Sequence, residues 1–139
     1  MTALNKSVEK GKRKMKKVAI LVCNNAVGEK CTGAGCIKAF NKKTGTFEKY
    51  RTEEVELQAF FQCNGCDKSL EEDEELKKKV ERIVEIHPDA VHVGICTINK
   101  EHRKHCETIK KMAQIFQDSG IEVVSGTHDS EILKMINDI

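Results

Sequence analysis

The sequence is poor in aromatic residues and in proline. Among 139 residues, aromatics make up 4%, with no Trp, one Tyr and one Pro. The core must therefore be aliphatic, and a surface that stacks the bases of single-stranded nucleic acid is not expected. No apolar run approaches the roughly 20 residues of a membrane span, and no charged-then-apolar secretory leader opens the chain. These absences predict a cytoplasmic protein.

Cysteine, in contrast, is abundant. The chain has 7 Cys, well above ordinary usage. An odd number cannot close as intramolecular disulfides alone. In a reducing cytosol, such a set indicates metal ligands or redox thiols.

The charge is unevenly distributed. The net charge is +2, yet residues 1–17 hold seven Lys or Arg and one Glu. The segment lacks apolar periodicity, which is typical of a solvated tail. We therefore expect a flexible basic arm over residues 1–15 and a single domain over residues 16–139. A nucleic-acid-associated module that uses this arm is an alternative function.

Four short apolar segments predict β-strands, at residues 18–22, 55–61, 90–95 and 121–124. The first is an uninterrupted apolar run, which is typical of a strand buried on both faces. Helical periods lie near residues 33–40, 76–84, 106–116 and 132–136, and residues 41–53 are predicted to form a loop with a small hairpin. This alternation predicts a three-layer α/β domain with a parallel four- or five-stranded sheet in the order 2-1-3-4, flavodoxin-like or Rossmann-like.

The positions of Cys and His are informative, because several follow the predicted strands directly. The carboxyl ends of parallel strands share one edge of the sheet, where open α/β sheets bind ligands. The loop after the first strand opens on the same edge. We therefore predict that scattered residues converge there on a metal site; the candidate ligands are Cys23, Cys31, Cys36, Cys63, Cys66, Cys96 and His128.

The sharpest local motif is Cys63-Asn64-Gly65-Cys66. A Cys-x-x-Cys turn lets two thiolates bind one ion, and zinc is the first expectation. An iron–sulfur cluster is the alternative cofactor, because soft thiolates suit both. The same spacing also serves a thiol–disulfide redox protein, in which Cys63 attacks and Cys66 resolves. Near a predicted helix start, Cys36 would be favoured as a thiolate by the positive end of the helix.

The remaining Cys and His residues favour structural roles. Cys106 fits the apolar face of its predicted helix, unless the turn with His102 and His105 lies over the site. His92 lies inside a predicted strand and is expected to pack against a helix. His87 precedes the single proline and is expected to cap a helix end.

In their order along the chain, these motifs resemble the CGGC domain, a small family of prokaryotic proteins. The resemblance is carried by residues 18–23, by the Cys31–Cys36 loop, by Phe60-Phe61 before the Cys-x-x-Cys turn, by Cys96 and by Gly126-Thr127-His128. The sequence departs from the family at Asn64, where the family has Gly; Asn tolerates left-handed backbone angles, so the turn is retained. The resemblance implies metal binding, with zinc as the expected ion, and implies no substrate.

Overall fold

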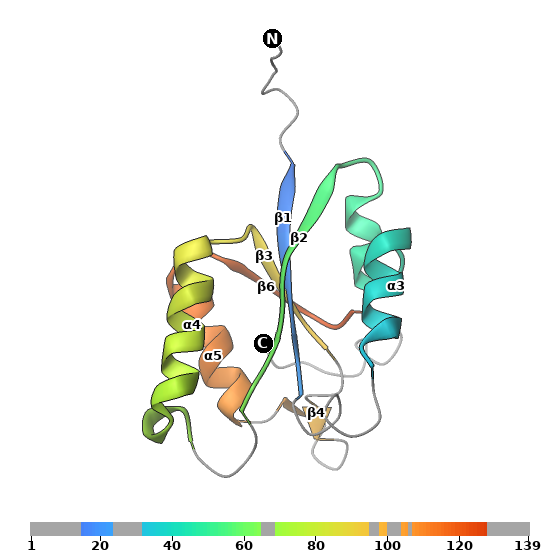
Figure 1. Cartoon of the computed structure of the whole chain (residues 1–139). Helices are drawn as coiled ribbons and strands as arrows, with labels where there is room; N and C mark the ends of the chain where they lie inside the picture. The colour runs from blue at the N-terminus through green and yellow to red at the C-terminus, as the bar shows by residue number, and fades with distance from the viewer. Residues whose placement is uncertain are drawn as a thin grey trace, which may run out of the picture.

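The computed structural model describes residues 15–23, 32–64, 69–94, 98–99, 104–105 and 107–127. A four-stranded parallel sheet runs through the centre, and helices cover both of its faces (Figure 1). Its strands are β1 (Lys16–Val22), β2 (Val55–Gln62), β3 (Ala90–Val93) and β6 (Glu122–Ser125). Their spatial order is β2-β1-β3-β6. The predicted α/β fold and the predicted order 2-1-3-4 are confirmed.

Two helices cover one face of the sheet. They are α4 (Glu74–Ile86) and α5 (Glu107–Asp118), with the short 3-10 helix η2 (Leu70–Glu72) beside them. Their buried apolar side chains form one cluster with alternate residues of the strands, such as Leu21 and Val91. Since burial of apolar area is the main favourable contribution to folding, this layer contributes much of the stability.

The opposite face is covered by α3 (Ala34–Lys42) and by the 3-10 helix η1 (Gly45–Tyr50). A second cluster forms there, in which Phe40 and Phe47 pack edge to face over the other alternate residues of β1. The expectation of an aliphatic core is therefore wrong on this face, because the few aromatic rings of the chain are concentrated in the interior. β1 is buried on both sides, because Val18 to Val22 are at most 1% exposed. Its uninterrupted apolar sequence therefore reports burial on two faces.

Both ends of α4 are capped by polar residues. Asp73 caps the first turn, since its side chain accepts a hydrogen bond from the backbone N–H of Leu76 at 3.1 Å. His87 ends the helix in the left-handed region, with φ of 51°. Its ring Nε2 donates to the carbonyl of Ser119 at 2.9 Å, at the end of α5. The expected role of His87 as a helix cap is confirmed.

Strand β2 contains an irregularity. Val18 pairs with Leu57, but Ala19 pairs with Ala59, so Gln58 is one extra residue in β2. Before this bulge Leu57 packs toward α3, and after it Ala59 packs toward α4 and α5. The bulge therefore reverses the faces to which alternate residues of β2 point.

Two segments differ from the sequence prediction. Residues 45–50 form the helix η1 where a loop with a small hairpin was predicted. Phe47 and Tyr50 are three residues apart, the period of a 3-10 helix, and both are buried. In addition, β4 (Ile98–Asn99) and β5 (Lys104–His105) pair antiparallel, a small element that was not predicted.

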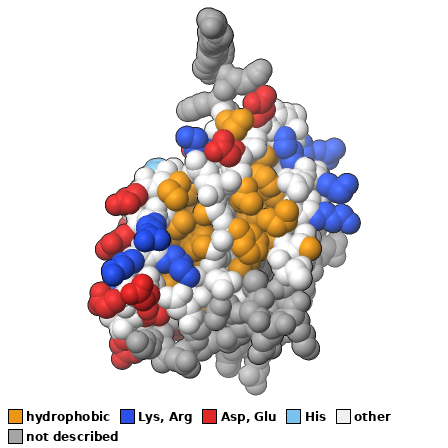
Figure 2. Space-filling view, viewed as in Figure 1, with side chains coloured by type: hydrophobic (Ala, Val, Ile, Leu, Met, Phe, Trp, Pro, Cys, Tyr) orange, Lys and Arg blue, Asp and Glu red, His pale blue; other side chains and the backbone are white. Residues whose placement is uncertain are grey.

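Strand β2 is an edge of the sheet, and its apolar side chains are only half buried. Figure 2 shows hydrophobic side chains gathered on this side of the molecule, between α4 and α3. Lysines lie at both ends of the edge: Lys43 donates to the carbonyl of Glu53, and Lys79 donates to that of Gln62. Charged side chains at an edge strand hinder pairing with another chain. No helix within the described residues is long and apolar enough to cross a membrane.

Candidate metal site at the carboxyl edge of the sheet

The four strands end level with one another. Val22 pairs with Gln62, Leu21 pairs with Val93, and Val93 pairs with Ser125. Cys23 and Cys63 are therefore the next residues on two adjacent parallel strands, which lie about 4.8 Å apart in any sheet. This register brings two of the seven candidate ligands to neighbouring positions at one edge.

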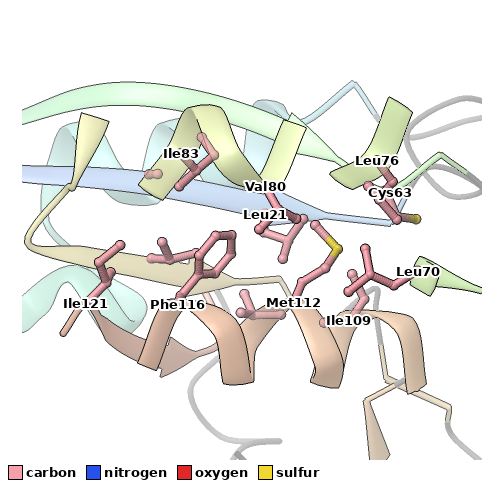
Figure 3. Close-up of a cluster of buried hydrophobic side chains, with 13 residues drawn as sticks. Leu21, Cys63, Leu70, Leu76, Val80, Ile83, Ile109, Met112, Phe116 and Ile121 are labelled. Atoms are coloured by element: carbon pink, nitrogen blue, oxygen red, sulfur yellow. The ribbon is translucent and has the colours of Figure 1, made fainter. Parts of the chain in front are cut away.

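Cys63 lies at the end of the apolar cluster beside α4 and α5. It is 4% exposed, and it groups with Leu70 and Leu76 (Figure 3). Two positions earlier on its strand, Phe61 packs on the same cluster. The thiol of Cys63 thus belongs to the α4 and α5 side of the sheet.

Cys36 lies on the other side, in the first turn of α3. Its Sγ is 3.1 Å from Oγ1 of Thr127, a buried residue that follows β6. Gly126 has φ of 102°, which favours glycine, and there the chain turns from the strand toward α3. The contact joins the start of α3 to the end of β6, and Thr127 is the residue directly before His128.

The described candidate ligands are therefore divided by the sheet. Cys63 packs on one face and Cys36 on the other, while Cys23 is half buried at the end of the central strand β1. No group of three potential metal-ligating side chains occurs within the described part of the chain. The other candidate ligands lie outside the described residues; they are Cys31, Cys66, Cys96 and His128. His102, Cys106 and residues 1–14 of the basic arm also lie outside them.

Lys79 of α4 holds the start of the Cys-x-x-Cys turn. Its Nζ donates to the carbonyl of Gln62 at 2.6 Å and to Oδ1 of Asn64 at 2.8 Å. These two residues flank Cys63. The Asn in place of the family's Gly thus supplies an acceptor that glycine lacks, and the sequence alone did not reveal this partner.

Gly33 shapes the α3 side of the site. It has φ of 80°, and a Cβ atom added there would lie 2.6 Å from Cζ of Phe60. Both the backbone conformation and the close ring require glycine at this position. The tight contact fixes the start of α3, and hence Cys36, against β2.

A buried polar chain lies behind the contact between Cys36 and Thr127. His92 of β3 is fully buried and stacks on Phe47 at a centroid distance of 4.3 Å. Its Nε2 is 2.8 Å from the hydroxyl of Tyr50, and its Nδ1 is 2.9 Å from Oγ1 of Thr46. The expected packing of His92 against a helix is confirmed, with η1 as that helix.

Burial determines the protonation states of His92 and Tyr50. It lowers the pKa of His92 to about 4 and raises the pKa of Tyr50 above its usual value. Both groups are therefore neutral near pH 7, and the ring of His92 has one N–H donor and one acceptor.

Comparison with known proteins identifies the family of the chain. Residues 17–128 match the CGGC domain. The chain belongs to the CGGC domain family. It is also similar to "Uncharacterized protein MJ0582" of Methanocaldococcus jannaschii, with 30% identity over 117 residues that cover 81% of this chain and 86% of that protein. No solved structure matches the chain. The resemblance inferred from the motifs is thus confirmed. The match to the CGGC domain includes His128 as its last residue.

Proposed function

We propose that this CGGC domain binds a thiophilic metal ion, zinc in the first instance, at the carboxyl edge of its sheet. Cys63 and Cys66 form the core pair of ligands, and two residues from the set Cys23, Cys31, Cys36, Cys96 and His128 complete a tetrahedral site. The observation that carries the proposal is the register that puts Cys23 beside Cys63 at the ends of adjacent strands. An iron–sulfur cluster would use the same thiolates.

The chemistry of the donor set supports a soft ion. Cys and His supply sulfur and nitrogen, whereas Mg²⁺ and Ca²⁺ prefer oxygen ligands. The family to which the chain belongs carries its name from the paired cysteines. Because the described thiols lie on both faces of the sheet, more than one ion is compatible with the set.

The direct test is metal analysis of protein purified without oxygen, by inductively coupled plasma mass spectrometry together with an ultraviolet–visible spectrum. We expect a stoichiometric metal and a colourless sample for zinc, or charge-transfer bands for an iron–sulfur cluster. A folded protein that contains no metal and takes up neither added Zn²⁺ nor reconstituted iron and sulfide would contradict the proposal.

Variants identify the ligands. Cys23→Ser and Cys63→Ala should weaken Zn²⁺ binding by more than about 100-fold, because changes outside the ligand shell already cost about 10–100-fold. Cys106→Ser is the matched control, since its position in the sequence favours a core role. Equal affinity in Cys63→Ala and Cys106→Ser would remove Cys63 from the site.

A thiol–disulfide redox protein that uses Cys63 and Cys66 is the second candidate, favoured by the Cys-x-x-Cys spacing. Reactive thiols are partly exposed, whereas Cys63 is 4% exposed and packed among leucines. We therefore rank it below metal binding. Titration against a glutathione redox buffer separates metal binding from redox activity. A redox protein should exchange disulfides with the buffer, and Cys63→Ser should abolish this exchange.

A further inference from the structure

The buried polar chain of Tyr50, His92 and Thr46 has only one consistent direction. The hydroxyl of Thr46 donates to the carbonyl of Gly126 at 2.8 Å. Its single proton is thereby used, so Oγ1 of Thr46 accepts from Nδ1–H of His92. Nε2 of His92 is then an acceptor, and the hydroxyl of Tyr50 donates to it. Each hydrogen bond in the chain fixes the next.

This series of hydrogen bonds ends at the backbone of residues 126 and 127, beside the candidate site. Besides the hydroxyl contact, the backbone N–H of Thr46 donates to the carbonyl of Thr127 at 2.8 Å. The N–H of Gly126 donates to the carbonyl of Val93. Residues 126 and 127 are thus held from β3 and from η1 together. Thr127 in turn contacts Cys36 through its hydroxyl.

We propose that Thr46, His92 and Tyr50 are positioning residues for the metal site: they fix Gly126 and Thr127, and through them the thiol of Cys36 and the point from which His128 departs. None of the three is a ligand. This inference rests on the proposed metal-binding function, which it extends by residues that act through hydrogen bonds behind the ligands. Such partners orient ligands, and their loss lowers metal affinity without removing a donor.

The test is a Zn²⁺ titration of the full chain, with a competing chelator, for Thr46→Val, Thr46→Ser and Thr44→Val. Thr46→Val keeps the shape and the backbone hydrogen bond but removes the hydroxyl. We expect it to weaken Zn²⁺ binding about 10-fold. Thr46→Ser retains the hydroxyl and should bind as the wild type does. Thr44→Val is the matched control, because Thr44 is exposed and its side chain makes no capping hydrogen bond.

A second variant approaches from the other end. Tyr50→Phe removes the donor to His92 and should weaken Zn²⁺ binding in the same direction but by less. Wild-type affinity in Thr46→Val would overturn the proposal. An equal loss in Thr46→Val and Thr46→Ser would also overturn it, since packing rather than the hydroxyl would then be responsible.

A measurement without metal separates this inference from the proposed function. The rate at which iodoacetamide alkylates Cys36 in the metal-free protein is read by mass spectrometry of its peptide. Loss of the Thr46 hydroxyl should raise this rate about fivefold, the effect of one net hydrogen bond on local opening. If the wild type binds no metal, a faster rate in Thr46→Val still supports the positioning role, and an unchanged rate refutes it.

Discussion

The two faces of the sheet are covered differently. On the side of α4 and α5, the buried residues are apolar, with the thiol of Cys63 at one end. On the side of α3 and η1, aromatic rings enclose a hydrogen-bonded chain that includes His92 and Thr46. Apolar packing as in the first layer tolerates volume-conserving substitution, whereas the second layer has one hydrogen-bond arrangement. Stability should therefore depend mainly on the first layer, and the position of Cys36 on the second.

The largest expected effect comes from the apolar layer. Phe116 of α5 is fully buried and packs edge to face on Phe61. Phe116→Ala should lower the free energy of unfolding by about 3–5 kcal/mol, from lost burial and the resulting cavity. Urea denaturation measures this loss. The rate at which iodoacetamide alkylates Cys36 in the folded molecules should be unchanged, and a large increase would show that the two layers are not separate.

The polar layer should give the protein a pH dependence. The pKa of His92 is about 4 in the folded protein and 6.5 ordinarily. The contribution of the neutral His92 to the free energy of unfolding is fully present above pH 6.5. It is lost as the pH falls toward 4, because His92 of the unfolded chain takes up a proton at a higher pH than His92 of the folded protein. The loss is about 3 kcal/mol. Urea denaturation of the wild type and of His92→Gln between pH 4 and 7 checks it: the difference between the two curves should narrow as the pH falls.

An intermediate effect is expected where the second layer meets β2. Gly33→Ala introduces a Cβ atom against the ring of Phe60 and strains a residue with φ of 80°. We expect a loss of about 1–3 kcal/mol. Combining it with Phe60→Leu should recover the steric part only. Strict additivity of the two changes in a double-mutant cycle would mean that the ring is not the obstacle.

The smallest effect is expected at the half-buried Lys79. Lys79→Met removes the hydrogen bonds to Gln62 and Asn64 and should cost about 1 kcal/mol. Asn64→Gly restores the family residue and removes one of the two acceptors. The double variant should lose less than the sum of the single losses, as measured by thermal unfolding. Additive losses would exclude a shared interaction.

The sequence was sufficient to predict the sheet, because buried parallel strands are uninterrupted apolar runs that need no knowledge of their partners. It was insufficient for η1, whose short 3-10 period at Phe47 and Tyr50 was not distinguished from a loop. The partners of His92 depend on that helix, so they could not be named. The register of Cys23 with Cys63 agrees with the predicted edge, whereas Cys36 and Cys63 are on opposite faces. Strand ends predict which edge a residue reaches, but not which face.

The extra residue Gln58 has a consequence for the thiols. Because it reverses the alternation of β2, Cys63 faces α4 rather than α3. The side-chain Oε1 of Gln58 is buried without a hydrogen-bond partner among the described residues, so the irregularity is retained at some energetic cost. Deleting Gln58 would join Leu57 directly to Ala59 in regular alternation, and the sulfur of Cys63 would remain on the side of α4 and α5. The side on which that sulfur emerges is thus set by Gln58 standing outside the ladder, five residues before the cysteine.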